Sequence, residues 1–365
     1  MRESLLSMIT KEQVLDALRH VEEPDLKKDL VTLNMIEDIK IDGSKVEFTV
    51  VLTTPACPLK DLIANACRNA IAHFVSADAQ VEIHMTSRVT AQKNQLADNI
   101  KNIIVVASGK GGVGKSTVAA NLAIGLAKKG AKVGLIDADI YGPSMPIMFG
   151  LEDAKPAAIQ LPDGKTRIEP IEKFGVKLLS IGFFTDPEQP IPWRGPMASN
   201  AVRQLFNDAN WGDLDYLVVD LPPGTGDIHI TLTQNYPVAG AVIVTTPQNV
   251  ALADAKKGIG MLLMESINVP LLGIVENMSY FTPAELPENK YYIFGQGGGQ
   301  VLAQQYGTAF LGEIPLVKSI SESGDAGEPV ILKEDNPMSA AFLEVAERVA
   351  QQVSIQNAKA FTGIS

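Results

Sequence analysis

The chain has 365 residues, of which 46% are hydrophobic and 20% charged, an ordinary composition for a globular protein with length for one large or two unequal domains. Its 31 Lys and Arg residues against 42 Asp and Glu residues give a net charge of −11, which argues against nonspecific nucleic-acid binding. No apolar run is long enough to span a membrane and residues 1–10 lack a signal pattern, so we expect a cytoplasmic protein that binds neither nucleic acid nor membranes.

The N-terminal part of the chain predicts a small α+β domain, which we place at residues 1–87. A capping box at Thr10–Gln13 opens its first helix. The expected elements, in chain order, are a helix at Lys11–His20, strands at Asn34–Ile41 and Lys45–Thr53, a helix at Lys60–Phe74 and a strand at Gln80–Thr86. Polar residues follow, and we assign residues 88–100 to a linker.

From residue 101 to 365 strands alternate with helices, which predicts an α/β domain with a doubly wound, mostly parallel sheet. The expected strands are near-continuous apolar runs, as in sheets covered on both faces. They are Asn102–Ser108, Lys132–Asp137, Tyr216–Asp220, Gly240–Thr245, Leu271–Glu276 and Ala309–Ile314. A hairpin is expected around Lys165–Leu179, and a last helix, Met338–Val353, should pack on the outside of the sheet.

The first strand of this domain runs into a glycine-rich turn that fits G-x-x-x-x-G-K-S and precedes a helix-forming segment, Ser116–Lys129. Such a turn lets successive backbone N–H groups face one phosphate, and the helix N-terminus adds partial positive charge. We expect Lys115 to reach the β- and γ-phosphates of ATP and Ser116 to bind Mg²⁺, as in a P-loop NTPase. The nucleotide-binding residues predicted here are Gly109, Lys110, Gly111, Gly112, Val113, Gly114, Lys115, Ser116 and Thr117.

Carboxylates end two further strands, at the sheet edge where ligands bind in open α/β folds. We expect Asp139 to orient the attacking water and Asp137 to help position that water or the metal shell; a turn or helix-cap pair is the alternative. Asp220 ends an apolar strand in the Walker B arrangement, which predicts a Mg²⁺ ligand. The loop Pro222–Asp227 can swing its backbone towards a γ-phosphate. Asn277 is a candidate for reading the adenine base, with turn chemistry as the alternative.

Lys110, directly after the first glycine, resembles the extra lysine of the deviant Walker A ATPases, a group that includes MinD, ParA and the nitrogenase iron protein. In that group the lysine reaches the nucleotide of a partner subunit, so the resemblance implies an ATP-dependent homodimer in which Lys110 acts in catalysis beside Lys115 and Asp139. A solvated loop charge is the alternative for Lys110.

Several stretches together resemble the Mrp/ApbC family of iron–sulfur cluster carrier ATPases. They are Gly109–Thr117, Asp137–Ser144, Trp193–Met197, Asp220–Asp227, Val275–Phe281 and Phe294–Gly295. The segment Leu52–Leu59 resembles part of the small domain often fused in front of that ATPase. The resemblance covers nearly the whole chain. It implies a homodimer that binds ATP and Mg²⁺, hydrolyses ATP slowly, and passes Fe–S clusters to apoproteins or works with assembly proteins.

The chain departs from that family at the cluster ligands. The family usually carries Cys-x-x-Cys shortly after Met-Ser-Tyr-Phe, whereas Thr282–Lys290 contains no cysteine. Cys57 precedes Pro58 at a predicted helix start, where the helix dipole would favour a thiolate, and it is our candidate ligand or transfer thiol. Cys67, about 15 Å further along the same predicted helix, is too far from Cys57 to share one cluster with it in a monomer and is expected in the core.

Two other functions remain open at this point. The missing cysteine pair favours an ATP-dependent scaffold or chaperone of the same family that binds no cluster. A positioning ATPase of the MinD/ParA kind is the second alternative, although the acidic composition and the lack of a basic helix count against it.

Overall fold

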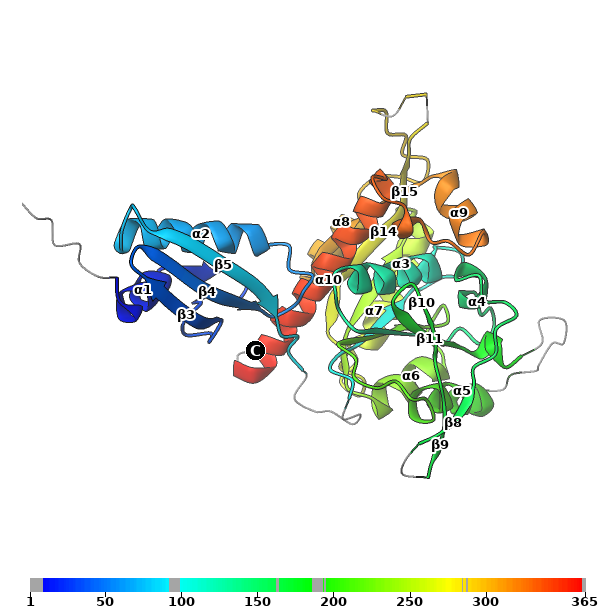
Figure 1. The fold of residues 1–365 in the computed structure, drawn as a ribbon. Coiled ribbons are helices and arrows are strands. Elements are labelled where there is room, and N and C mark those ends of the chain that lie inside the picture. The colour runs from blue at the N-terminus through cyan, green and yellow to red at the C-terminus, as the bar shows by residue number, and fades with distance from the viewer. Residues whose placement is uncertain are drawn as a thin grey trace, which may run out of the picture.

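The computed structural model describes residues 9–91, 99–161, 164–185, 193, 195–283, 285–286 and 288–362, with the backbone alone for residues 361 and 362. Within these ranges the chain builds a small three-stranded sheet and a large sheet, each with its own apolar core (Figure 1). Parts of the predicted linker, and Arg194 of the Trp-Arg-Gly-Pro-Met stretch, lie outside the described residues. The domain boundary at residues 88–100 stays a prediction.

The small unit has the five predicted elements in their predicted order and, between the first helix and the first predicted strand, a short antiparallel pair, β1 (Glu22–Glu23) and β2 (Lys28–Asp29), that was not predicted. The five are α1 (Lys11–Leu18), β3 (Ile36–Asp42), β4 (Lys45–Leu52), α2 (Lys60–Phe74) and β5 (Gln80–Ser87). The capping box at Thr10 and Gln13 is present. β4 pairs antiparallel with β3 and parallel with β5, and alternate residues of β4, such as Phe48, face the helices.

The large sheet has eight strands among the described residues, and its order is β10-β11-β7-β12-β6-β13-β14-β15. In chain order these are β6 (Ile103–Ala107), β7 (Val133–Asp137), β10 (Ile171–Lys173), β11 (Val176–Ser180), β12 (Tyr216–Asp220), β13 (Val238–Thr245), β14 (Leu271–Phe281) and β15 (Phe310–Leu316). All pairs are parallel except β10 with β11. A separate antiparallel pair joins β8 (Ala158–Gln160) to β9 (Thr166–Ile168).

Helices cover both faces of the large sheet, which confirms the doubly wound prediction. α3 and α10 pack on one face, and α5, α6, α7 and α8 contribute to the core on the other. The helices of this unit are α3 (Lys115–Lys128), α4 (Met145–Met148), α5 (Gly195–Asn207), α6 (Asp227–Asn235), α7 (Asn249–Leu262), α8 (Gly298–Tyr306), α9 (Lys318–Asp325) and α10 (Pro337–Thr362). None of the helices in the described ranges is both long and apolar enough to cross a membrane.

Three differences between the predicted and the observed elements matter for the fold. The predicted hairpin forms as β10 and β11, and β11 joins the large sheet beside β7, which the local sequence pattern did not indicate. β14 continues past Glu276 to Phe281, where it pairs with Tyr291. α10 runs nine residues beyond the predicted end at Val353, because its last turns are held by contacts from outside the large sheet.

Side chains of α10 and β12 hold the small unit against the large one. Gln351 of α10 donates to both carboxylate oxygens of Asp25, at 2.8 and 2.9 Å. The buried Tyr216 hydroxyl, at the start of β12, lies 3.0 Å from the Thr54 hydroxyl, to which it donates. Figure 1 shows the small sheet beside the C-terminal turns of α10. Docking of the two units therefore depends on side chains far apart in the sequence.

Candidate active site

The carboxyl ends of four neighbouring strands bring the predicted site residues together. Asp220 lies opposite Val106 of β6 on one side and opposite Asp137 of β7 on the other. Ser180 of β11 is the next residue in the same row. Because the strands are parallel and in this register, the glycine-rich turn after β6 opens directly over these polar groups.

Lys115 is the cation at the centre of this group and its side chain is 6% exposed. Its ammonium lies 2.7 Å from Asp220 Oδ1 and 3.7 Å from Asp139 Oδ2. The Ser116 hydroxyl donates to Asp220 Oδ2 at 2.6 Å. A lysine, a hydroxyl and carboxylates within contact distance can hold a hydrated Mg²⁺ and the phosphates that it bridges.

Asp137 is fully buried behind this group. It accepts hydrogen bonds from the backbone N–H of Met145 and of Asp139 and from the Ser180 hydroxyl. Burial and the charge of Asp220 raise the pKa of Asp137 to about 7, although the hydrogen bonds from Met145 and Ser180 and the charge of Lys115 oppose the shift. Burial also raises the pKa of Asp139, against the opposing effect of Lys115.

The glycine-rich turn is held by close packing at both ends. A β-carbon on Gly109 would lie 2.1 Å from the Asp254 carbonyl carbon in α7. Gly114 has a φ of +80°, and the neighbouring Asn277 donates to the Val113 carbonyl at 2.8 Å. Asn277 lies within β14, and its hydrogen bond to Val113 braces the turn. Its contact with the adenine base stays a prediction.

The middle of the turn, in contrast, is open. Gly111 and Gly112 are exposed, whereas Val113 is buried. The Lys110 side chain is exposed and forms no ion pair within the described part of the chain. This leaves Lys110 free to meet a group from outside the subunit.

The loop after Asp220 lies against this turn. The Gly224 N–H donates to the Ser108 carbonyl at 2.9 Å, and α6 begins directly afterwards at Asp227. A β-carbon on Gly195 would lie 2.4 Å from an Asp227 carboxylate oxygen, so the start of α5 packs closely on the start of α6. The loop thus connects the phosphate site to the α5–α6 pair.

His229, in the first turn of α6, is a residue of this region to which our sequence analysis assigned no role. Its side chain is buried, and neither ring nitrogen has a hydrogen-bond partner. Burial and the charge of Lys115 lower its pKa to about 4. A buried polar group without a partner costs about 1–3 kcal/mol. In the sequence, the feature that could have indicated a role for His229 is its position two residues after Pro-Pro-Gly-Thr-Gly-Asp.

We expect the buried neutral imidazole to make the fold sensitive to acid. The unfolded chain binds a proton near pH 6.5 that folded His229 does not bind until about pH 4, so stability falls as the pH decreases through this window. His229→Leu lacks this group, so the difference between its free energy of unfolding and that of wild type should grow by about 3 kcal/mol as the pH falls through this window.

Urea unfolding of both proteins at several pH values across this window checks the expectation. Asp137 is present in both proteins, so its own titration largely cancels in the difference. A difference in unfolding free energy that does not change with pH would contradict the assignment.

The two cysteines lie in the small unit. Cys67 is fully buried in its core, as predicted. Cys57 is half-buried and lies three residues before α2, which begins at Lys60, so the two are not in one helix. The predicted thiolate at Cys57 is wrong: burial raises the pKa of its thiol to about 11. Within the described ranges, no three His, Cys, Asp or Glu side chains are arranged so that they alone could hold a metal ion.

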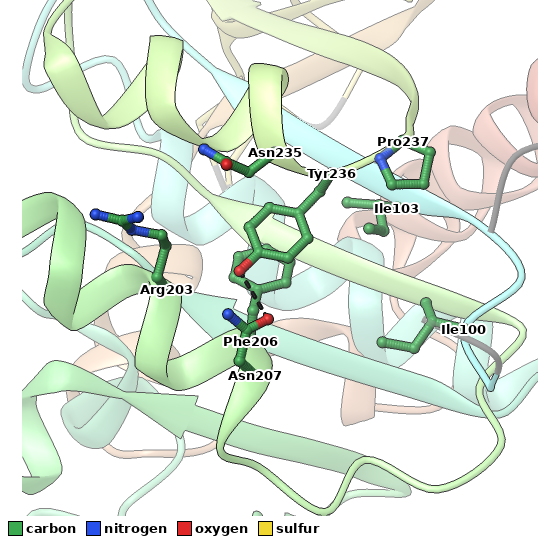
Figure 2. A pocket seen from close by; sticks show the side chains of 8 residues that line it. All are labelled: Ile100, Ile103, Arg203, Phe206, Asn207, Asn235, Tyr236 and Pro237. Atoms are coloured by element: carbon green, nitrogen blue, oxygen red, sulfur yellow. Dashed lines mark hydrogen bonds between the residues drawn. The ribbon is translucent and has the colours of Figure 1, made fainter. Parts of the chain in front are cut away.

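A pocket of about 290 Å³ lies between the C-terminal ends of α5 and α6 (Figure 2). The stacked rings of Phe206 and Tyr236 form one side, and the Tyr236 hydroxyl donates to Asn207 Oδ1 at 3.0 Å. Ile103, the first residue of β6, forms another side. Because the glycine-rich turn follows the opposite end of β6, this pocket is separate from the phosphate site.

Comparison with known proteins identifies both parts of the chain. Residues 99–350 match the family described as NUBPL iron-transfer P-loop NTPase. Residues 11–105 match the family described as iron-sulfur cluster assembly protein.

Curated relatives match over almost their whole length. An iron-sulfur cluster carrier protein of Synechocystis is 48% identical over 95% of this chain and 99% of the relative. A protein of the same name from Deinococcus radiodurans is 46% identical over 94% and 95%, respectively. Among solved structures, a nucleotide-binding protein of Archaeoglobus fulgidus in complex with ADP is 40% identical, with a TM-score of 0.56, and covers 66% of this chain and 90% of its own.

Proposed function

This chain belongs to the NUBPL family of iron-transfer P-loop NTPases, and we propose that it is a cytoplasmic, ATP-hydrolysing carrier that delivers iron–sulfur clusters to apoproteins. The observation that carries the ATPase part is the cluster of Lys115, Ser116, Asp139 and Asp220 under the glycine-rich turn. The carrier part is supported by relatives named iron-sulfur cluster carrier protein that match nearly the whole chain.

The geometry supports a distinct role for each residue. Lys115 neutralises charge on the β- and γ-phosphates once it turns from the carboxylates to the nucleotide. Ser116 and Asp220, which already contact each other, hold Mg²⁺. Asp139 positions the attacking water, because its carboxylate lies beside Lys115, and the buried Asp137 holds the backbone of Asp139 and Met145 in place.

The exposed Lys110 supports a homodimer. Its backbone belongs to the phosphate-binding turn, but its side chain has no ion-pair partner within the described residues. In the proposed ATP-bound dimer it reaches the phosphates of the partner subunit, and hydrolysis releases the Pro222–Asp227 loop and reopens the surface that clients contact.

The cluster is cargo, and Cys57 is the thiol that we propose as its ligand in this chain. The whole chain contains two cysteines, and Cys67 is sealed in the core of the small unit. Cys57 borders the docking contacts of Thr54 and is accessible in part. Since one thiol cannot bind a cluster alone, the remaining ligands come from a second subunit, a client or a small thiol.

Anaerobic reconstitution with iron, sulfide and glutathione tests this proposal. We expect wild type and the matched control Cys67→Ala to acquire stoichiometric iron with a visible charge-transfer band, and Cys57→Ala to acquire none. Iron bound equally by Cys57→Ala would exclude Cys57 as the ligand. No iron in any variant, with ATP hydrolysis intact, would favour the scaffold or chaperone alternative that the missing Cys-x-x-Cys suggests.

A further inference from the structure

Two residues beside the phosphate site carry buried polar atoms without a hydrogen-bond partner. Among the described residues, the buried side-chain nitrogen and oxygen atoms without a hydrogen-bond partner are Ser144 Oγ and both ring nitrogens of His229. Ser144 lies in the segment after Asp139, and His229 lies just after the Pro222–Asp227 loop. Buried polar groups in folded proteins are nearly always paired, so these atoms point to a second arrangement in which partners reach them.

The loop that could supply a partner for His229 lies next to its ring. The carbonyl oxygens of Pro222 and Gly226, close to the two ends of the loop, lie near enough to the ring to raise the pKa of His229 as hydrogen-bond acceptors, against the larger lowering effects of burial and Lys115. Neither oxygen completes a hydrogen bond with a ring nitrogen. On its other side the loop is tied to the glycine-rich turn through Gly224 and Ser108. Because these two carbonyls belong to the loop, a change in the loop backbone changes how they meet the imidazole.

We propose that His229 is a positioning residue for ATP hydrolysis: one ring N–H donates to a carbonyl of the Pro222–Gly226 loop when that loop turns towards the γ-phosphate, and so holds it closed. The inference rests on the ATPase activity proposed above. His229 does not touch the phosphates; it acts through the loop whose backbone would contact them.

The surroundings of the ring suit this role. Burial and the positive charge of Lys115 keep the imidazole neutral at physiological pH, so it has one donor and one acceptor nitrogen. The main chain of His229 is fixed in α6, where its N–H donates to Gly226 and its carbonyl accepts from the Thr233 hydroxyl. A ring anchored in this way is a fixed partner towards which the loop can move.

Three substitutions separate hydrogen bonding from packing. His229→Leu fills the same space without a polar atom, His229→Asn places an amide nitrogen near the position of Nδ1, and His229→Gln places one near that of Nε2. For His229→Leu we expect kcat for ATP hydrolysis to fall about tenfold, the effect of one hydrogen bond made only in the closed loop. KM for ATP should stay nearly constant, and one of the two amides should restore kcat.

Hydrogen exchange supplies a second readout that needs no turnover. We expect Mg²⁺ with a slowly hydrolysed ATP analogue to protect the amides of residues 222–229 in wild type and in the restoring amide variant, but not in His229→Leu. Wild-type kcat in His229→Leu, or equal loss in all three variants, would overturn the inference. If wild type hydrolyses ATP no faster than Lys115→Ala, the ATPase proposal fails. The hydrogen-exchange experiment then still tests His229, because a wild-type protein whose residues 222–229 are not protected by the ATP analogue would overturn the proposed role of His229.

Discussion

Lys115→Ala is expected to abolish ATP hydrolysis. The ammonium is the cation on which Asp220 and Asp139 converge, and the side chain is almost fully buried beneath the phosphate-binding turn. Its removal takes away a fixed positive charge where negative charge develops during phosphoryl transfer, a loss of at least about a hundredfold in kcat. Phosphate release measured at saturating ATP and Mg²⁺ checks this result.

The same substitution leaves buried carboxylates without their cation, which can destabilise the fold by about 3–5 kcal/mol. Circular dichroism and thermal unfolding must therefore show that the variant is folded. Ser116→Ala removes the proposed Mg²⁺ ligand without changing the charge and should also lose activity. Lys318→Ala, whose side chain is 85% exposed and pairs with Glu322 on the surface, is the control and should behave as wild type. Undiminished turnover in Lys115→Ala would refute the site.

Gly109→Ala should disrupt the fold of the site as well as its activity. A β-carbon at Gly109 would lie 2.1 Å from the Asp254 carbonyl carbon and 2.4 Å from the Ala255 nitrogen, both backbone atoms of α7. Backbone cannot rotate away as a side chain can, so either the turn or α7 must move. We expect a loss of about 3 kcal/mol or more in the free energy of unfolding, measured by urea denaturation, together with loss of ATP binding.

Gly111→Ala is the matched control within the same turn. The nearest atom to a β-carbon there is Pro223 Cγ at 3.9 Å, an ordinary contact, so the unfolding free energy should change by no more than about 0.5 kcal/mol. Any effect of Gly111→Ala should appear in nucleotide binding alone. Equal stability of the two alanine variants would show that Gly109 is not held by close packing against α7.

Local patterns predicted much of this protein because their physical causes are local. The phosphate-binding turn needs glycines followed by Lys115 and Ser116, and any chain that places them between a strand and a helix builds the same site. Asp137 and Asp220 could be placed at the same edge of the sheet because parallel strands end there, whereas the structure shows that their strands are neighbours. The expected thiolate at Cys57 failed because its pKa depends on burial and on acidic residues that include Glu347 of α10, far away in the sequence.

By itself, then, the sequence determined the P-loop, the carboxylates beside it, the doubly wound sheet and the absence of the cysteine pair, since each depends on residue types at short spacing or at strand ends. Only the tertiary structure decided that β11 joins the large sheet, that α10 and Tyr216 dock the small unit, and that His229 lies buried and unpaired beside the loop Pro222–Asp227. These features arise from side chains brought together across long stretches of chain, and no local periodicity records which partners a buried side chain will meet.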